Sequence, residues 1–285
     1  MRLSPIVKWA GGKTKVLPYF LPLYEASQCT RLVDLFCGSL SLPLAIPHPT
    51  HTEAVFNDVN TPLINLYTSV QQEYSELTRV LEQLNAPYMN TREQYENIRE
   101  VFNFDREDPV LTGARFLYLN RRGFNGLYRE NRSGEFNVPY RAYNTPIYSP
   151  ETFSEFSEWC QSGLTFYNRD VFSFPLEFFR PGDLVYLDPP YYPSDESKFT
   201  SYWRTPFHVK EQIALAEFCA KLDKRGIKFI VSNSPCEQVR KLYQGFHQHE
   251  FRIERQMRDA KQGSKGSSSQ VNEILIWNFG KLNFD

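Results

Sequence analysis

The sequence predicts an α/β fold, in which a mainly parallel sheet is flanked by helices and interrupted by an inserted helical segment with a β-hairpin. Six short apolar runs have strand character, and five of them end in polar or glycine-containing turns, as buried parallel strands do. Helical patterns alternate with these runs. The alternation fails between residues 61 and 148, which predicts a second domain inserted into the first.

The expected elements follow in order along the chain. Helical spacing of apolar residues predicts one helix at 62–84, with Pro62 in its first turn, and another at 207–224, ending before Gly226. Residues 1–60 and 149–285 are expected to form one discontinuous catalytic domain, and residues 61–148 the inserted one. The strands are expected at 31–36, 53–56, 164–167, 183–187, 227–231 and 271–279. A loop rich in glycine and serine is expected at 262–270.

The composition excludes several classes of protein. Of the 285 residues, 41% are hydrophobic and 23% charged, which is close to globular averages. No apolar run reaches the roughly 18 residues of a membrane span. No apolar core follows Met1, so no secretory signal is expected. The five cysteines are widely spaced without a C-x-x-C pattern, which predicts a cytoplasmic location with neither disulfides nor a metal site.

Positive charge is concentrated in the inserted segment. The whole chain has a net charge of −1, but residues 115–141 contain six arginines and two acidic residues. Within this stretch, residues 127–130 and 135–138 flank a turn at 131–134 and predict a hairpin. A local basic ribbon of this kind is typical of nucleic-acid binding by a chain that is not basic overall.

The most informative motif is Asp188-Pro189-Pro190-Tyr191, directly after a predicted strand. Two prolines make the turn stiff, so the Asp188 carboxylate and a backbone carbonyl form two acceptors aimed at one place. An exocyclic amine has two donors that fit this pair, and Tyr191 offers a ring for stacking on the base that carries the amine. The alternative is a strand end at which an aspartate opens a proline turn.

The N-terminal motif Lys8-Trp9-Ala10-Gly11-Gly12-Lys13-Thr14 resembles a phosphate loop only in part. A phosphate loop needs a glycine where Val7 stands, so an ATPase is disfavoured. The glycine pair permits close approach of a ligand, Lys13 offers a cation for a carboxylate, and Trp9 offers an aromatic face. The alternative is a flexible basic start of the chain.

Two further strand ends carry candidate ligand-binding groups. The motif Asp34-Leu35-Phe36-Cys37-Gly38 follows the first strand, without the G-x-G-x-x-G pattern of dinucleotide binding. Asp58 follows the second strand about 20 residues after Gly38, a spacing that suits a carboxylate accepting from a ribose diol. The alternative role of Asp58 is to cap the following helix.

In this order, over nearly the whole length, these motifs resemble the Dam-type DNA adenine methyltransferases, which use S-adenosylmethionine. The resemblance includes N-R-R-G-F-N-G-L-Y-R at 120–129 and G-E-F-N-V-P at 134–139. It implies a Rossmann-like methyltransferase sheet and methylation of the adenine amine in double-stranded DNA, with GATC as the expected site. The adenine would leave the duplex and attack the methyl group in line.

The resemblance also implies roles for individual residues. Asp188, Pro189 and Tyr191 would act on the adenine. The cofactor would be held by Trp9, Lys13, Phe36, Gly38, Asp58, Asp170 and Asp188. Phe124 would enter the vacated stack, Asn125 would face the orphaned thymine, and Leu127 and Arg129 would contact base edges. Further DNA contacts or hairpin support would come from Lys8, Arg99, Asn131, Asn137, Pro139 and Tyr143.

The sequence departs from the family in two places, one of which is a longer Gly/Ser loop after Asp259, and two rival functions stay open. Many relatives have F-x-G-x-G after the first strand, where this chain has Leu40 at the second glycine and Ser39 before it. A cytosine-amine methyltransferase would usually have serine at the place of Asp188. A regulator that binds cofactor or DNA without catalysis would not need the intact motif at 188–191. We expect a monomer, with a companion restriction endonuclease left open.

Overall fold

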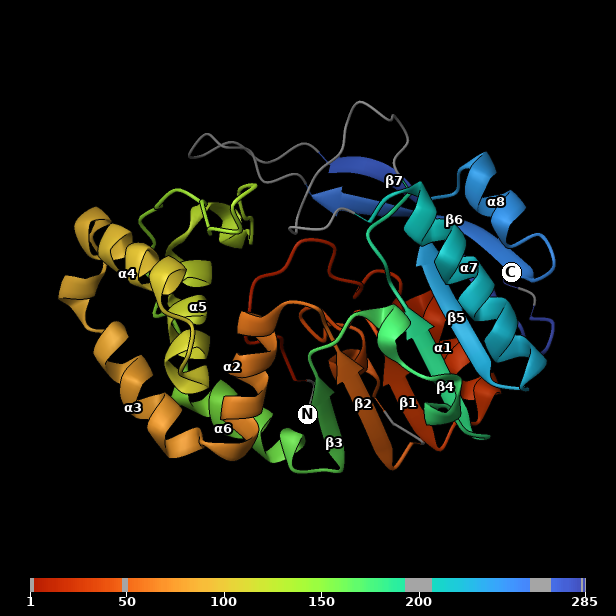
Figure 1. Ribbon diagram of the computed structural model, residues 1–285, viewed down its shortest axis with the longest axis horizontal. Coiled ribbons are helices and arrows are strands. Elements are labelled where there is room, and N and C mark those ends of the chain that lie inside the picture. Colours follow the sequence, from red (N-terminus) through yellow and green to blue (C-terminus); the bar gives the residue numbers. More distant parts are fainter. Residues whose placement is uncertain (1–2, 48–50, 193–206, 257–267, 283, 285) are drawn as a thin grey trace.

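The computed structural model describes residues 3–47, 51–192, 207–256, 268–282 and 284. Its strands form one sheet with the order β3-β2-β1-β4-β5-β7-β6, in which only β7 runs antiparallel to its neighbours (Figure 1). The bounds are β1 Arg31–Asp34, β2 Glu53–Asn57, β3 Leu164–Tyr167, β4 Asp183–Leu187, β5 Lys228–Asn233, β6 His247–Gln256 and β7 Ser268–Trp277. The predicted α/β class with a mainly parallel sheet is therefore confirmed.

The two faces of the sheet are buried by different helices. Helix α1 (Leu17–Ser27) places Phe20 and Leu23 in the core on one face. Helices α7 (Val209–Lys224) and α8 (Glu237–Leu242) cover the other face, where Leu215 belongs to one core cluster with Val33 of β1 and with a valine each of β2 and β4. Strand residues alternate between the two cores, as side chains of successive strand residues must.

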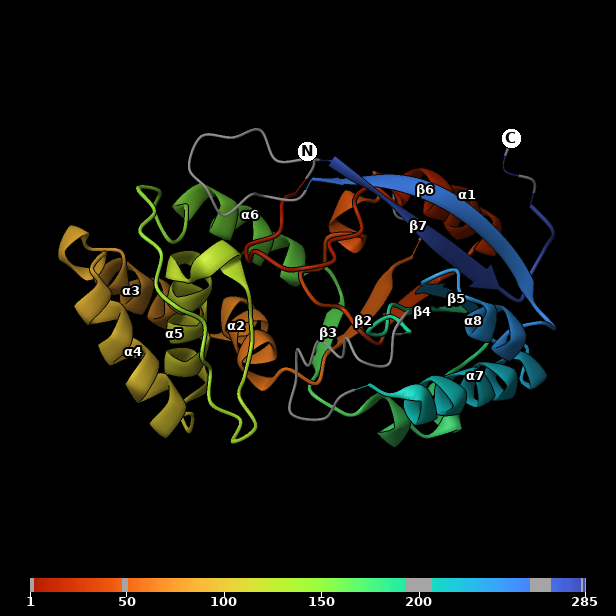
Figure 2. The same ribbon diagram turned by 90° about the horizontal axis from the view of Figure 1, so that it is seen from above.

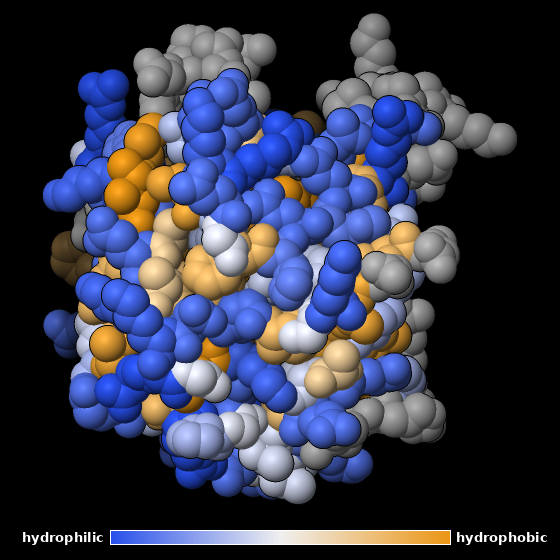
Figure 3. Space-filling model, turned by 90° about the vertical axis from the view of Figure 1, so that its right-hand side faces the viewer, coloured by the Kyte–Doolittle hydropathy of each residue, from blue (hydrophilic) through white to orange (hydrophobic). Residues whose placement is uncertain are grey.

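The outer surface on the side of α7 and α8 is mostly hydrophilic, with smaller apolar patches (Figure 3). No helix among the described residues is long and apolar enough to cross a bilayer. The five cysteines are free thiols, and four of them are buried.

The segment between β2 and β3 forms a helical body beside the sheet. Helix α2 packs against β3 and α6 on one side and against α5 on the other, so it connects the sheet to this body (Figures 1 and 2). Several helices begin at side-chain caps: Asp108, for example, accepts from the Leu111 amide at 2.9 Å before Pro109. The bounds are α2 Thr61–Gln72, α3 Tyr74–Leu84, α4 Arg92–Phe104, α5 Pro109–Arg122 and α6 Pro150–Cys160.

The predicted hairpin is present as an irregular antiparallel ribbon at residues 123–141. Gly123 pairs with Tyr140 and Glu130 with Phe136, each as an isolated bridge. The tip is a turn at 131–134, closed by the Asn131 amide, which donates to the Glu135 carbonyl at 2.8 Å. Next to this turn, the buried Glu130 carboxylate accepts from Tyr128 Oη at 2.6 Å and from Arg106 Nη1 at 3.0 Å.

Some elements differ from the prediction for identifiable reasons. The helix expected at 62–84 is two helices, because the backbone at Glu73 has φ −127° and ψ 37° and ends α2. Strand β7 begins at Ser268, so the expected loop at 262–270 ends earlier, and its residues up to 267 lie outside the described part of the chain. Helix α1 tolerates Pro22 in its interior, because burial of its apolar face against the sheet outweighs the lost backbone hydrogen bond.

Leu40 occupies a backbone conformation that favours glycine. Its φ is +59°, a region that costs a non-glycine residue about 1–2 kcal/mol. Its side chain is fully buried in the core, which offsets this strain because burial of a leucine contributes about 2–3 kcal/mol. The chain thus keeps the turn of the F-x-G-x-G motif while replacing its second glycine.

Candidate active site

The register of the sheet brings three strand ends to one level. Asp34 of β1 pairs with Phe56 of β2 and with Tyr186 of β4. Continuing the same register by two residues places Phe36, Asp58 and Asp188 side by side at the carboxyl ends of these strands. This edge of a parallel sheet is where α/β folds bind ligands.

Asp188 is held by a cation from the N-terminal segment. Lys13 Nζ lies 2.9 Å from Asp188 Oδ2 and 4.8 Å from the centre of the Tyr191 ring, and the Lys13 side chain is only 6% exposed. Lys13 is fixed in turn by its own backbone amide, which donates to Ser41 Oγ at 2.8 Å. The structure therefore joins two motifs that are 175 residues apart in the sequence.

Tyr191 is partly buried, and its hydroxyl lies near a buried carboxylate of β7, that of Glu273. Burial, together with the nearby Asp188 and Glu273 carboxylates, raises the pKa of the Tyr191 hydroxyl far above its usual value. Glu273 itself is 0% exposed. Tyr191 is thus a neutral ring with a fixed orientation, as stacking on a substrate requires. No local pattern pointed to Glu273, because β7 lies far along the sequence from the motif at 188–191.

Gly38 and Asp58 form a second part of the site, beside Trp9. Asp58 Oδ2 accepts from the Gly38 amide at 3.0 Å, and its Oδ1 accepts from the Asn60 amide at 2.9 Å. Burial raises the pKa of the Asp58 carboxyl to about 6. A Cβ atom added to Gly38 would lie 2.8 Å from Trp9 Nε1, so only glycine permits this close approach.

Aromatic rings adjoin this second part. Phe36 contacts Phe207 edge to face at 5.8 Å between centroids, and Phe207 stacks on Phe172 at 6.3 Å. Asp170 is exposed at the end of β3, and its Oδ1 accepts from the Phe172 amide at 2.7 Å. Phe172 and Phe207 were not predicted from the sequence. In the described part of the chain, Asp170 makes no direct hydrogen bond to Asp58 or Gly38.

The residues predicted to contact DNA fall into two groups. In the first, Lys8 Nζ lies 4.0 Å above the Tyr143 ring, and Tyr143 Oη accepts from the Asn125 amide at 3.1 Å. Arg141 Nη1 donates to Asn125 Oδ1 at 3.1 Å, and Arg141 Cζ lies 5.5 Å from the centre of the Phe124 ring. Arg141 was not among the predicted contacts, although it is one of the six arginines of the basic segment.

The second group lies along the ribbon. Arg129 is exposed, and its Nε donates to Asn137 Oδ1 at 2.7 Å, which fixes the guanidinium. The side-chain amide of Asn131 is used within the turn, where its Nδ2 donates to Glu135 Oε2 at 2.7 Å. Arg99 Nη1 donates to the Val138 carbonyl. Leu127 is partly buried and Pro139 is exposed.

Asn120 connects the first group to the N-terminal segment. Its Oδ1 accepts from the Lys8 amide at 2.9 Å, and its Nδ2 donates to the carbonyls of Lys8 and Gly126 at 2.7 and 2.8 Å. A Cβ atom on Gly126, whose φ is +64°, would lie 2.4 Å from Lys8 Cβ. Asn120 and Gly126 therefore place Lys8 against residues 124–126, which form the foot of the ribbon.

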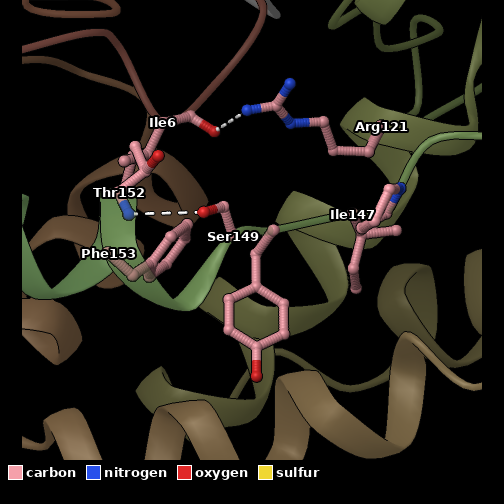
Figure 4. A pocket seen from close by; sticks show the side chains of 8 residues that line it. Ile6, Arg121, Ile147, Ser149, Thr152 and Phe153 are labelled. Atoms are coloured by element: carbon pink, nitrogen blue, oxygen red, sulfur yellow. Dashed lines mark hydrogen bonds between the residues drawn. The ribbon is translucent and has the colours of Figure 1, made fainter.

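A separate cavity of about 180 Å³ lies where the N-terminal segment meets α5 and α6 (Figure 4). Arg121 reaches across it and donates to the Ile6 carbonyl at 2.6 Å. The cavity includes none of the predicted site residues. The described residues contain no group of three or more His, Cys, Asp or Glu side chains arranged to hold a metal ion.

Comparison with known proteins agrees with this geometry. Residues 9–257 match the family of D12 class N6 adenine-specific DNA methyltransferases. The chain is 34% identical to the retron Ec67 DNA adenine methylase of Escherichia coli, over 96% of this chain and 90% of that protein.

Two other relatives also match nearly the whole chain. Identity is 32% with the type II methyltransferase M1.LlaDCHI of Lactococcus lactis subsp. cremoris, over 98% of this chain and 97% of the relative. It is also 32% with the DNA adenine methylase of E. coli K12, over 94% and 93%. This chain therefore belongs to the D12 class of N6 adenine-specific DNA methyltransferases, enzymes whose methyl donor is S-adenosylmethionine.

Proposed function

We propose that this DNA adenine methyltransferase acts at GATC in duplex DNA, rotates the target adenine out of the helix and methylates its amine by direct in-line transfer. The observation that carries the proposal is the corner at 188–191, where the Lys13 ammonium contacts both the Asp188 carboxylate and the Tyr191 ring. Asp58, which accepts from Gly38, follows a strand that ends at the same edge of the sheet. The described residues 61–148 would serve as the target-recognition domain, and 1–60 with 149–285 as the catalytic domain.

The residues present fit S-adenosylmethionine. The cofactor supplies a methyl group on a sulfonium, which is already an activated leaving group. Each Asp58 oxygen accepts one hydrogen bond from a backbone amide and has a second lone pair left. The carboxylate can therefore also accept hydrogen bonds from the two hydroxyls of a ribose. Trp9 beside Gly38 and the Phe36 ring offer apolar walls, and Asp170 would lie near the adenine of the cofactor. The Lys13 ammonium has three donors and can hold a carboxylate in addition to Asp188.

Cofactor binding should weaken in acid because of Asp58. Its pKa of about 6 lies above the ordinary value, so the carboxyl becomes protonated and loses acceptor capacity as the pH falls through 6. We expect the Kd for S-adenosylmethionine, measured calorimetrically between pH 5 and 8, to rise up to about tenfold per pH unit below 6. Asp58→Asn should bind more weakly with this dependence removed. If the Kd of wild type and of Asp58→Asn changed with pH in the same way, Asp58 would not be the acceptor of hydrogen bonds from the cofactor.

The corner at 188–191 would activate and orient the target amine. Asp188 and the Pro189 carbonyl would accept its two hydrogens, while Tyr191 stacks on the adenine. No general base with a shifted pKa is required, because the amine can lose its proton after it has attacked the methyl group. Lys13 would keep the Asp188 carboxylate in position.

The ribbon and the foot of the ribbon would read the DNA. Phe124 would fill the stack that the adenine leaves, at an unstacking cost of a few kcal/mol, and Asn125 would face the unpaired thymine. Arg129 and Leu127 would contact base edges in the major groove, and Lys8 a second guanine. Pro139 and Tyr143 would complete the base contacts, with support from Arg99, Asn131 and Asn137.

Methyl transfer from tritiated S-adenosylmethionine tests this function. Duplexes with one GATC should be labelled at adenine N6, and duplexes with the same bases in scrambled order should not. Digestion of the products with methylation-sensitive nucleases would identify the site. A 2-aminopurine at the target position should become fluorescent when the enzyme binds, which reports base flipping. Equal labelling of both duplexes would overturn the GATC assignment, and unchanged fluorescence would overturn base flipping.

A further inference from the structure

Two buried side-chain amides lie directly behind the corner at 188–191. Gln212 of α7 and Asn233 at the end of β5 are both 0% exposed. Gln212 Nε2 donates to the Pro190 carbonyl at 2.7 Å. Asn233 Oδ1 accepts from the Tyr192 amide at 3.0 Å. The two side chains thus bind the backbone on both sides of Tyr191.

The two amides are also joined to each other. Asn233 Nδ2 donates to Gln212 Oε1 at 3.0 Å. The Pro190 carbonyl can only accept and the Tyr192 amide can only donate, so the orientation of both side-chain amides is determined along the whole series. Ser234 adds a bond by donating from Oγ to the Tyr192 carbonyl at 3.1 Å. Burial makes each of these hydrogen bonds costly to lose.

The two prolines leave the corner dependent on such contacts. Pro189 and Pro190 have no backbone N–H, so neither can be fixed by donating to the rest of the sheet. The Pro190 carbonyl and the Tyr192 amide are the groups through which α7 and β5 hold the turn. Because the turn is stiff, fixing Pro190 and Tyr192 also fixes the direction of the Pro189 carbonyl and the Tyr191 ring.

We propose that Gln212 and Asn233 form a positioning clamp that aims the corner at the target amine. This inference rests on the proposed role of residues 188–191 toward adenine. The clamp touches neither the adenine nor the cofactor, and acts only through the backbone of the turn. A displacement of about 1 Å at a reacting group can lower a rate by about 10²-fold, so loss of the clamp should lower kcat with little change in binding.

Two substitutions of Gln212 separate its hydrogen bonds from its volume. Gln212→Met keeps the volume and removes the donor to Pro190, and should lower kcat about 10–100-fold at every pH. Gln212→Glu is isosteric, but its ionised form opposes the Pro190 carbonyl with an oxygen, whereas its protonated form can donate. Its kcat relative to wild type should therefore rise as the pH falls from 9 to 6.

Gln244→Glu is the matched control, because Gln244 is exposed on the turn after α8 and should leave kcat unchanged at every pH. Kd values for S-adenosylmethionine and duplex should stay within about twofold of wild type in all variants, measured by equilibrium binding. If a Gln212 variant does not fold, Ser234→Ala replaces it in the test. It removes only the hydrogen bond to the Tyr192 carbonyl and should lower kcat by a smaller factor. Three results would overturn the clamp. The first is a wild-type kcat in Gln212→Met, and the second is a change confined to the Kd values. The third is a kcat that is equally reduced and independent of pH in both Gln212 variants.

The clamp and the proposed function can fail separately. The assays use whichever duplex the wild-type enzyme labels. If that duplex lacks GATC, the specificity proposal fails and the clamp is still tested. If wild type labels GATC and Gln212→Met does so at the same kcat, only the clamp fails.

Discussion

Replacing Asp188 with alanine is expected to lower kcat for methyl transfer about 10³-fold while duplex binding stays within about threefold of wild type. The substitution removes one of the two acceptors proposed for the adenine amine. It also leaves the Lys13 ammonium, whose side chain is 6% exposed, without the carboxylate that lies 2.9 Å away. Single-turnover transfer from tritiated cofactor and fluorescence anisotropy of a labelled duplex would measure the two effects.

Two further variants separate chemistry from stability in this experiment. Asp188→Asn keeps one acceptor oxygen and should retain more activity than Asp188→Ala. Glu217→Ala removes an exposed carboxylate of α7 and should leave both measurements unchanged. Thermal unfolding would register the cost of the unpaired Lys13 charge, which is about 3–5 kcal/mol when a buried pair loses one partner. Turnover by Asp188→Ala at the wild-type rate would contradict the mechanism.

Replacing Arg129 with alanine is expected to relax specificity at one base pair of the recognition site. Asn137 holds the guanidinium through Nε and Nη2, and with five donors the group can still offer a bidentate pair to a guanine. The lost discrimination should be about 1–3 kcal/mol, a ratio of roughly 5–150 in kcat/KM between the cognate duplex and the duplex substituted at that pair. Competition assays with single-substituted duplexes would identify the pair.

Arg132 provides the matched control for this prediction. It is exposed at the tip of the same ribbon and has no role in the proposed base contacts. Arg132→Ala should weaken every duplex by a similar factor, if it has any effect, and a phosphate contact would reduce the salt dependence of binding by about one unit of slope. If Arg129→Ala shows this uniform loss instead, Arg129 contacts a phosphate.

The family relationship explains which alternatives from the sequence can be set aside. The match to adenine-specific DNA methyltransferases over residues 9–257 excludes the phosphate-loop ATPase and makes the cytosine-amine alternative unnecessary. The monomeric state and the cytoplasmic location stay predictions, and no prediction is made about a companion endonuclease. Base flipping and GATC specificity are proposals, which the fluorescence and labelling experiments described above test.

The sequence alone determined the parallel strands, their polar ends and the corner at 188–191. These features depend on local chemistry: strand burial follows from short apolar runs, and a D-P-P-Y turn is stiff wherever it occurs. The hairpin was predictable from its turn at 131–134 for the same reason. Helix α1 was missed because Pro22 in its interior argues locally against a helix, and packing on the sheet offsets this effect.

Only the tertiary structure decided which distant groups meet at the site. Lys13 reaches Asp188, Asn120 holds Lys8, and Gln212 with Asn233 holds the corner, in each case across an interface between separate elements. Such contacts depend on the crossing of helices and the order of strands, which no local pattern encodes. The residues proposed to act on the adenine can thus be identified from sequence motifs. The residues that position them can be identified only from the folded structure.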